Sequence, residues 1–211
     1  MIDNDSAFDK KAHWEDVYSD KASHEVSWYQ QHPEYSLNLI KATGVDTSAH
    51  IIDIGGGAST LVDHMLDDGY QHLSVLDISS GAIQQAKKRL GDRADEIEWI
   101  EHDITEFLTD ENYDVWHDRA VFHFLTDPLD RSNYVHTMSR ALKPGSHAII
   151  ATFALNGPER CSGLEVQRYD PDSMIAVLGD QFEFVEAVSE EHVTPSGSAQ
   201  NFIYCRFKRV A

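Results

Sequence analysis

Three aspartates and a run of glycines carry the chemistry that the sequence suggests most directly. Asp53, Asp77 and Asp103 each lie at the end of an apolar segment, in "IIDIGGGAS", "VLDIS" and "EHDIT". Glycines allow a ligand to approach the main chain closely, and carboxylates accept hydrogen bonds from hydroxyl and amine groups. The glycines that follow the first acid are Gly55, Gly56 and Gly57. Together these groups suit a nucleoside ligand with a cationic amine.

Two nucleotide-binding motifs fit less well. In the dinucleotide pattern G-x-G-x-x-G/A the last position would be Thr60, and the Asp53 carboxylate would lie poorly beside a pyrophosphate. A P-loop is excluded, because no Gly-Lys-Ser/Thr follows the glycines. S-adenosylmethionine carries an ammonium group and a sulfonium but no phosphate. We therefore expect it as the cofactor.

The second and third acids have natural partners in that cofactor. We expect Asp77 to accept both ribose hydroxyl protons, as an acid in this position does in dinucleotide folds. Asp103 is expected to bind the adenine amine, with Ile78 and Ile104 as apolar walls. Taken singly, each acid also fits a helix cap or a solvated strand end, so the prediction rests on all three together.

The elements that position these residues alternate along the chain. Strands are expected at residues 49–54, 72–78, 97–104, 113–119 and 146–153, and helices at 58–68, 79–90, 127–142 and 171–178. Such alternation with short connections predicts a mainly parallel sheet covered on both faces. Two further strands, at residues 182–194 and 201–210, flank a Gly-containing turn and predict an antiparallel hairpin. Helices are also expected at 7–20 and 33–43, before the first strand.

Composition limits the partners and the compartment. The chain has 211 residues and a formal net charge of −19, which should repel nucleic acid and anionic lipid. Two cysteines without a CxxC pattern, and twelve scattered histidines, favour free thiols and no bound metal. The amino terminus has no apolar signal core, and no apolar run is long enough to span a bilayer. We expect a cytoplasmic protein without nucleic-acid or membrane partners.

The same segments resemble the class I S-adenosylmethionine-dependent methyltransferases over residues 33–210. "DIGGGAS" is similar to their first motif, with Ser59 where a third glycine is common, and "YDVWHDRAVFHFL" and "LKPGSHAIIATF" resemble the fourth and fifth strand regions. The resemblance implies a three-layer α/β/α Rossmann-like sandwich with a seven-stranded sheet, order 3-2-1-4-5-7-6, and strand 7 antiparallel. It implies a single domain over residues 1–211, with lid helices in residues 1–45 and the core in 46–211. Methyl transfer would convert the cofactor into S-adenosylhomocysteine.

Candidates for the acceptor side come first from the end of the fourth strand. His117 and Asp118 lie there, where many amine and protein methyltransferases have a polar Asn/Asp-Pro-Pro-Tyr motif that this chain lacks. Asp118 is a candidate for contact with the cofactor ammonium or for proton acceptance. His123 is either a proton acceptor or a packing residue, and Phe122 beside it is a candidate for substrate contact.

The remaining candidates lie in two loops and the first helix. Trp28 and Tyr29 suit either core packing or a lid over the sulfonium, and Trp14 has the same two interpretations. In the loop after the fifth strand, Cys161 is either reactive or a plain free thiol. Two arginines there are candidates for an anion clamp on the substrate, Arg160 and Arg168.

Three functions remain open on the sequence. The first is methyl transfer to a small molecule with a thiol or another soft nucleophile, because no strong base is evident. The second is a protein-lysine N-methyltransferase. The segment "HWEDVYSDKASHEVSWYQ" resembles the amino terminus of a subgroup that includes such enzymes. The third is a non-catalytic cofactor-binding module, which the intact glycine loop and acids disfavour. The sequence is compatible with a monomer or a homodimer.

Overall fold

A single sheet of seven strands organises the protein. The computed structural model describes residues 8–210. The strand order is β3-β2-β1-β4-β5-β9-β8, parallel from β3 to β5, and β9 runs antiparallel to both of its neighbours. The strands are β1 His50–Ile54, β2 His72–Asp77, β3 Ile97–Glu101, β4 Tyr113–Arg119, β5 Leu142–Phe153, β8 Phe182–Val193 and β9 Ala199–Arg209. This confirms the predicted Rossmann-like order, with β9 as the antiparallel strand.

The helices begin where the sequence supplies capping groups. Asp127 caps α5 and is followed by Pro128, and Asp170 caps α6 in the same way with Pro171. A side-chain oxygen at this position binds main-chain N–H groups that the helix leaves free, and proline fits the first turn. The helices are α1 Lys10–Asp20, α2 Glu34–Ala42, α3 Leu61–Asp67, α4 Ser80–Leu90, α5 Pro128–Ala141 and α6 Pro171–Leu178, with short 3-10 turns at Ser23–Glu25, Gly91–Glu96 and Phe122–Phe124.

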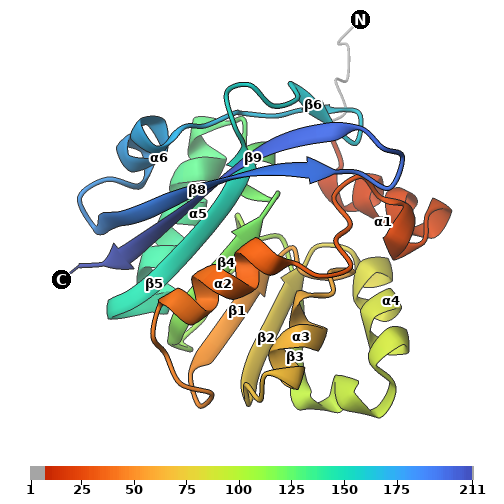
Figure 1. Ribbon diagram of the computed structural model, residues 1–211, viewed down its shortest axis with the longest axis horizontal. Helices are drawn as coiled ribbons and strands as arrows, with labels where there is room; N and C mark the ends of the chain where they lie inside the picture. Colours follow the sequence, from red (N-terminus) through yellow and green to blue (C-terminus); the bar gives the residue numbers. More distant parts are fainter. Residues whose placement is uncertain (1–7, 211) are drawn as a thin grey trace, which may run out of the picture.

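Two buried clusters lie on opposite faces of the sheet, with helices on both sides (Figure 1). On one face, α2 and α3 pack against side chains such as Ile51 and Val115. On the other face, α5 and α6 pack against side chains such as Ile52 and Trp116. Consecutive residues of a strand point to opposite faces, so neighbours in sequence enter different clusters. This alternation decides which residues of β4 can reach the site.

The differences from the predicted elements are local. β5 begins at Leu142, four residues before its expected start, because a register shift opposite Tyr113 lets the strand continue through Gly145. A two-stranded hairpin, β6 Arg160–Cys161 and β7 Leu164–Glu165, forms in the loop after β5, where no strand was expected. α1 begins at Lys10, and residue 7 of the helix expected there lies outside the described residues.

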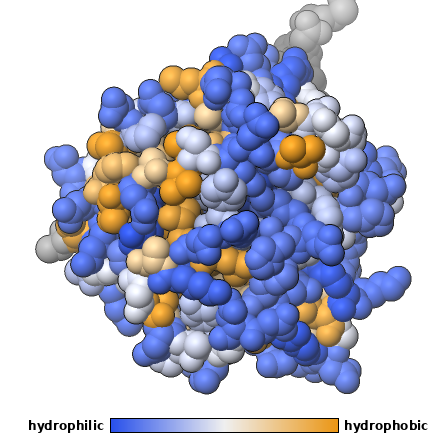
Figure 2. Space-filling view, viewed as in Figure 1, coloured by the Kyte–Doolittle hydropathy of each residue, from blue (hydrophilic) through white to orange (hydrophobic). Residues whose placement is uncertain are grey.

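Most of the surface in view is hydrophilic, as the net charge leads one to expect (Figure 2). Apolar side chains gather over α6 and β8, where Ile175, Phe184 and Val185 are exposed. Within residues 8–210 no helix combines the length and the apolar character that a bilayer crossing requires.

Candidate active site

The glycine loop lies at the carboxyl edge of the sheet, directly after β1. Gly55 adopts a φ of 67°, which favours glycine, and its N–H donates to the Leu76 carbonyl at 2.6 Å. A Cβ atom at this position would collide with the Val121 side chain. The loop therefore runs closely between the ends of β2 and β4, and only glycine fits its first position.

Asp77 joins this loop to the end of β2. One of its carboxylate oxygens accepts the Gly57 N–H at 3.0 Å, and the other accepts the Ser79 N–H at 2.8 Å. Burial, together with the nearby charges of Asp53 and Glu15, raises the pKa of Asp77 to about 6. Each oxygen keeps a further lone pair, so the carboxylate can still accept a pair of hydroxyl protons from a ligand.

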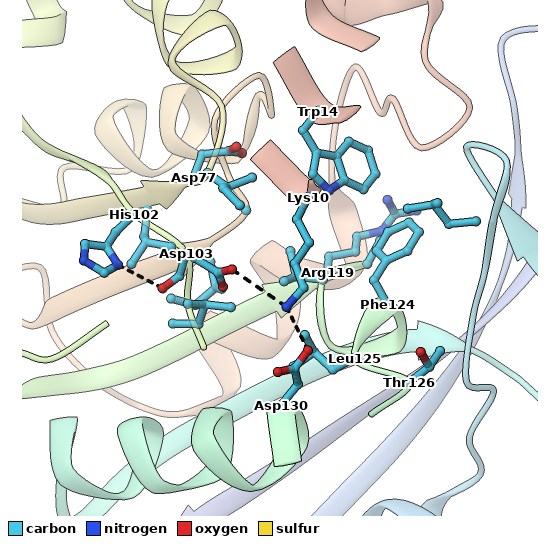
Figure 3. Close-up of a pocket in the computed structure, with 18 of the residues that line it drawn as sticks. Lys10, Trp14, Asp77, His102, Asp103, Arg119, Phe124, Leu125, Thr126 and Asp130 are labelled. Carbon is cyan, nitrogen blue, oxygen red and sulfur yellow. Dashed lines mark hydrogen bonds and ion pairs between the residues drawn. The ribbon is translucent and has the colours of Figure 1, made fainter. Parts of the chain in front are cut away.

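Asp103 follows β3, and a lysine reaches it from the first helix. One carboxylate oxygen of Asp103 accepts both the N–H and the hydroxyl of Thr105, each at 2.8 Å. The Nζ atom of Lys10 lies 3.8 Å from the other oxygen and 2.7 Å from the Asp130 carboxylate (Figure 3). One oxygen of Asp103 is thus held by its own turn, and the second faces the space beneath α1.

These residues line a cavity of about 290 Å³. Asp77 and Asp103 lie on one side of it, and the aromatic residues Trp14 and Phe124 lie on the other (Figure 3); Ile78 and Ile104 also line the cavity. The ring centres of Trp14 and Phe124 lie 5.0 Å apart, and those of Trp14 and Trp28 lie 5.8 Å apart. The remaining lining residues include Gly55, Leu76, Ala120, Val121, Leu125, Thr126, Asp127, Leu164 and Glu165.

A second, smaller cavity of about 40 Å³ lies against the glycine loop, and Trp28, Arg119 and Gly55 line both cavities. Ser59 and Tyr29 line the smaller one, together with Asp53, Gly56 and His117. His117 lies beneath it in a buried chain of hydrogen bonds. Its Nδ1 is 2.7 Å from the Asp53 carboxylate, and its Nε2 is 2.8 Å from the Ser36 hydroxyl on α2. Both ring nitrogens of His117 are therefore engaged within the protein.

Arg119 ties the loop that carries Trp28 to the sheet. Its guanidinium donates to the Trp28 carbonyl at 3.0 Å and to the Tyr204 hydroxyl at 2.7 Å, and it pairs with Glu190 at 3.4 Å. Glu190 also accepts from the Gln30 amide at 2.6 Å. The loop around Trp28 is held as a fixed wall of the site, whereas the sequence suggested a lid as one of two alternatives.

The first helix covers the cavity and is attached by Glu15. Its carboxylate accepts hydrogen bonds from the N–H groups of Ser80 and Gly81 at the start of α4, and from the hydroxyls of Ser79 and Ser80. Partial burial raises the pKa of Glu15, but these hydrogen bonds outweigh the effect of burial and hold the pKa below its usual value. α1 is therefore attached beside the turn that contains Asp77.

Ala120 lies in the left-handed region, with a φ of 74°, directly after β4. Its N–H donates to the Ala151 carbonyl at 2.9 Å, which fixes the peptide. A non-glycine residue in this conformation stores backbone strain, which concentrates at functional sites. The strained turn carries Ala120 and Val121 into the cavity wall.

The structure places three predicted catalytic or substrate residues outside the described cavities. Asp118 points to the α5 face, where its carboxylate accepts from Val121, Phe122 and the Tyr134 hydroxyl, and burial raises its pKa to about 6. Phe122 is fully buried beside Tyr134. His123 is also fully buried, and burial lowers its pKa to about 3. These side chains pack around the turn after β4 and line neither cavity.

The predicted residues of the loop after β5 also lie elsewhere. Arg160 donates to the Gly163 carbonyl within its own hairpin, and Arg168 binds Glu159 and the Gly157 carbonyl. Cys161 is buried, and burial raises the pKa of its thiol to about 11, so it is a poor nucleophile. From this loop it is Leu164 and Glu165 that line the cavity.

Several site residues lack a sequence signal. Lys10, Glu15 and Glu190 are surface-type residues whose partners lie far away in the chain, and Glu165 belongs to an unexpected hairpin. Arg119 lies with His117 and Asp118 in the strand end that the sequence singled out for the acceptor side, and Glu15 directly follows Trp14. Side chains along a strand alternate between the two faces of the sheet. This rule places Arg119 and His117 on one face and Asp118 on the other.

Known proteins match this arrangement. A family model described as a methyltransferase domain matches residues 51–145, which run from β1 through α5 into β5. Over these residues, a little under half of the chain, the protein is similar to a methyltransferase domain.

Individual relatives are similar in sequence to this chain over only part of their length. The chain is 40% identical over 80 residues to malonyl-[acyl-carrier protein] O-methyltransferase of Anoxybacillus flavithermus, covering 37% of this chain and 30% of that protein. It is 28% identical over 99 residues to mouse eEF1A lysine and N-terminal methyltransferase, covering 47% and 14%. The chain thus spans less than a third of the length of these two relatives.

A solved structure reproduces the fold. The N-methyltransferase NodS of Bradyrhizobium japonicum WM9 in complex with S-adenosylhomocysteine superimposes with a TM-score of 0.70 at 19% identity, covering 92% of this chain and 97% of that one. At this identity the likeness establishes the fold of the chain alone.

The residues of the cavity fit the cofactor. Asp77 and Asp103 offer carboxylate acceptors of the kind that a ribose diol and an exocyclic amine require, and Ile78 and Ile104 are apolar residues of the same lining. The two cations of the wall, Lys10 and Arg119, are already paired with carboxylates, so no cation remains for a pyrophosphate. The lining of the cavity therefore suits a cofactor without phosphate.

Proposed function

We propose that this chain transfers the methyl group of S-adenosylmethionine to a small-molecule acceptor. The observation that carries the proposal is the continuous cavity of about 290 Å³, which joins Asp77 and Asp103 to aromatic side chains beneath α1. Aromatic side chains of this kind can pack around the apolar part of a small acceptor. A folded protein surface would have to displace α1, which Glu15 and Lys10 attach to the core.

The cofactor supplies a methyl carbon bound to a positively charged sulfur, which is already reactive. The protein must align the acceptor and exclude water. Arg119 binds the main chain of Trp28, which lines both cavities, and the turn at Ala120 and Val121 also lines the larger one. Aromatic faces stabilise positive charge, so Trp28 suits the sulfonium. Positioning by fixed walls is the role we assign to these residues.

A dedicated base is not part of this proposal. His123 and Asp118 are buried outside the cavity, and His117 is bound on both nitrogens. The acceptor must therefore arrive with an available lone pair or lose its proton to water. A soft acceptor such as a thiol remains a prediction, and the acidic lining weighs against its anionic form.

A protein-lysine substrate is the second candidate. The mouse relative is named a lysine methyltransferase, and the carboxylates Asp127, Asp130 and Glu165 line the cavity, where they would attract a lysine side chain. This candidate requires α1 to move aside. A non-catalytic cofactor-binding module is the remaining alternative, and the continuous cavity disfavours it.

We also infer that residues 1–211 act as one domain, with residues 1–45 covering the core in 46–211. A cytoplasmic location and a monomeric or homodimeric state fit the composition. The acidic net charge of −19 supports the expectation that nucleic acid and membranes are not partners.

Transfer of a labelled methyl group tests the proposal. The purified chain is incubated with methyl-labelled S-adenosylmethionine and with either a small-molecule extract or a protein extract. We expect label in small molecules, with S-adenosylhomocysteine released in equal amount, and loss of both with Asp77→Ala. Label in a protein band alone would establish the lysine candidate. Cofactor binding without any transfer would favour the non-catalytic module.

A further inference from the structure

We propose that the acceptor is an amine, bound in the cavity as its ammonium form and recognised by Glu165, which lines the cavity together with the aromatic rings of Trp14 and Phe124. This inference rests on the proposed function and names the class of its substrate. Two independent features carry it: the imbalance of charge along the wall, and the aromatic rings of the lining.

The lining residues carry more acid than base. Five carboxylates line the cavity, against one lysine and one arginine. Both cations are already neutralised, Lys10 by Asp130 at 2.7 Å and Arg119 by Glu190 at 3.4 Å. The raised pKa of Asp77 has burial as its main cause, and neighbouring carboxylates add to it. A thiolate, carboxylate or phosphate would be repelled by such a wall, whereas a cation would be attracted.

Glu165 is the carboxylate placed for this role. It lies on β7 next to Leu164, lines the cavity and is exposed to solvent. The other acids of the wall are engaged: Asp103 with Thr105 and Lys10, Asp130 with Lys10, and Asp127 with the Leu129 N–H.

Glu165 itself has no such partner: among residues 8–210 no ion pair or side-chain hydrogen bond involves its carboxylate. Arg160 stands opposite it in the hairpin, but the Arg160 guanidinium donates to the Gly163 carbonyl. The negative charge of Glu165 is therefore available to a ligand.

The aromatic rings complete an ammonium site. Trp14 lies edge-on to both Phe124 and Trp28, with interplanar angles of 76° and 82°. Rings in several orientations present faces to a bound cation, and a cation over an aromatic face gains more when it is desolvated. The same rings stabilise the positive charge that an amine nitrogen acquires during methylation.

The step balances without a base on the protein. The bound ammonium gives one proton to water at the open side of the cavity. The lone pair of the resulting amine forms the new N–C bond as the C–S bond breaks, and the electron pair of that bond goes to sulfur. The sulfonium charge is thereby lost, and the nitrogen becomes a methylammonium cation.

Binding of matched ligands to the protein loaded with S-adenosylhomocysteine tests the inference by calorimetry. The probes are 2-phenylethylamine, 2-phenylethanol and 3-phenylpropionate, which share an apolar part and differ in charge. We expect the amine to bind about fivefold to tenfold more tightly than the alcohol, a difference of about 1–1.4 kcal/mol. The carboxylate should bind most weakly.

Variants separate the role of Glu165 from general effects. Glu165→Gln should weaken binding of the amine about threefold to tenfold, as expected for loss of one charge, and leave binding of the alcohol unchanged. Glu165→Asp should restore part of the loss. Glu159→Gln is the matched control, because Glu159 lies in the same loop, is exposed and does not line the cavity. It should change neither affinity.

The outcomes distinguish the two proposals. Equal binding of amine and alcohol, tighter binding of the carboxylate, or no binding of any probe while S-adenosylhomocysteine binds would each overturn the amine inference and leave the proposed function. Failure of S-adenosylhomocysteine itself to bind would overturn the proposed function. Preferred turnover of a thiol over an amine would also overturn the amine inference alone.

Discussion

The guanidinium of Arg119 donates a hydrogen bond to the main-chain carbonyl of Trp28 at 3.0 Å, across 91 positions of the chain. The same guanidinium lies over the Phe202 ring at 4.2 Å and pairs with Glu190, which is 6% exposed. The wall that lines both cavities is therefore stabilised by strands from the opposite end of the sequence. Its position depends on the balance of charge between Arg119 and Glu190.

Removal of this arginine should be costly because it leaves a buried carboxylate without its cation. We expect Arg119→Met to lower the free energy of unfolding by about 3 kcal/mol. The double variant with Glu190→Gln should recover a large part of the loss, because the uncompensated charge is gone. Denaturant unfolding of the two single variants and the double variant measures this coupling, and a strictly additive result would contradict it.

Replacement of Glu15 should loosen α1. Glu15→Ala removes hydrogen bonds to the first turn of α4 and should lower the free energy of unfolding by about 1–2 kcal/mol. Asp16→Ala, an exposed neighbour on the same helix, is the control and should have little effect.

The effect of Glu15 should depend on pH with a definite sign. The folded-state pKa of Glu15 is lowered, so its contribution is present above the unfolded value of about 4.3 and is lost as pH falls through the folded value. The difference between the wild type and Glu15→Ala should therefore shrink in acid. A difference that grows in acid would refute this role.

The left-handed turn at Ala120 should respond to glycine in an unusual way. Strain relief of about 1–2 kcal/mol opposes the usual entropic cost of about 0.5–1 kcal/mol, so Ala120→Gly should be neutral or slightly stabilising. Ala148→Gly, in the middle of β5, should lower the stability. Thermal unfolding of both variants is the measurement, and equal losses at the two positions would show that Ala120 is not strained.

The variant His123→Phe distinguishes a structural role of this histidine from a catalytic one. Its Nδ1 accepts the Phe153 N–H at 3.3 Å, so His123→Phe strands that donor and should cost about 1–3 kcal/mol of stability. The rate of methyl transfer, measured well below the unfolding temperature, should change little. A general base would contribute about 10²–10⁴ to the rate, so a loss of that size would restore His123 as a catalytic residue.

The carboxyl edge of the sheet could be predicted from the sequence because its signals are local. Asp53 and Asp77 lie at the ends of β1 and β2, Asp103 follows β3, and parallel strands bring their carboxyl ends to one edge. The acceptor side could not be predicted in the same way. Glu15 meets α4 about 65 positions later, and the turn after β4 buries His123 where its type and place suggested catalysis. Such contacts depend on packing between distant elements, which periodicity does not encode.

Asp77 links cofactor binding to pH. Its folded-state pKa, about 6, lies above the unfolded value of about 3.9, so the folded protein without cofactor takes up a proton first and gains stability as pH falls from 7 towards 5. A ribose diol needs the ionised carboxylate as acceptor. Affinity for the cofactor should therefore decrease below about pH 6, while the stability of the free protein increases.

Calorimetric titration of S-adenosylhomocysteine into the wild type and Asp77→Ala tests the central claim most directly, with Asp114→Asn at the other edge of the sheet as control. We predict tight binding by the wild type and the control, and a loss of about 1–3 kcal/mol in Asp77→Ala, which strands the ribose hydroxyls. Undiminished affinity in Asp77→Ala, or no binding by the wild type, would contradict the placement of the adenosyl group at this edge of the sheet.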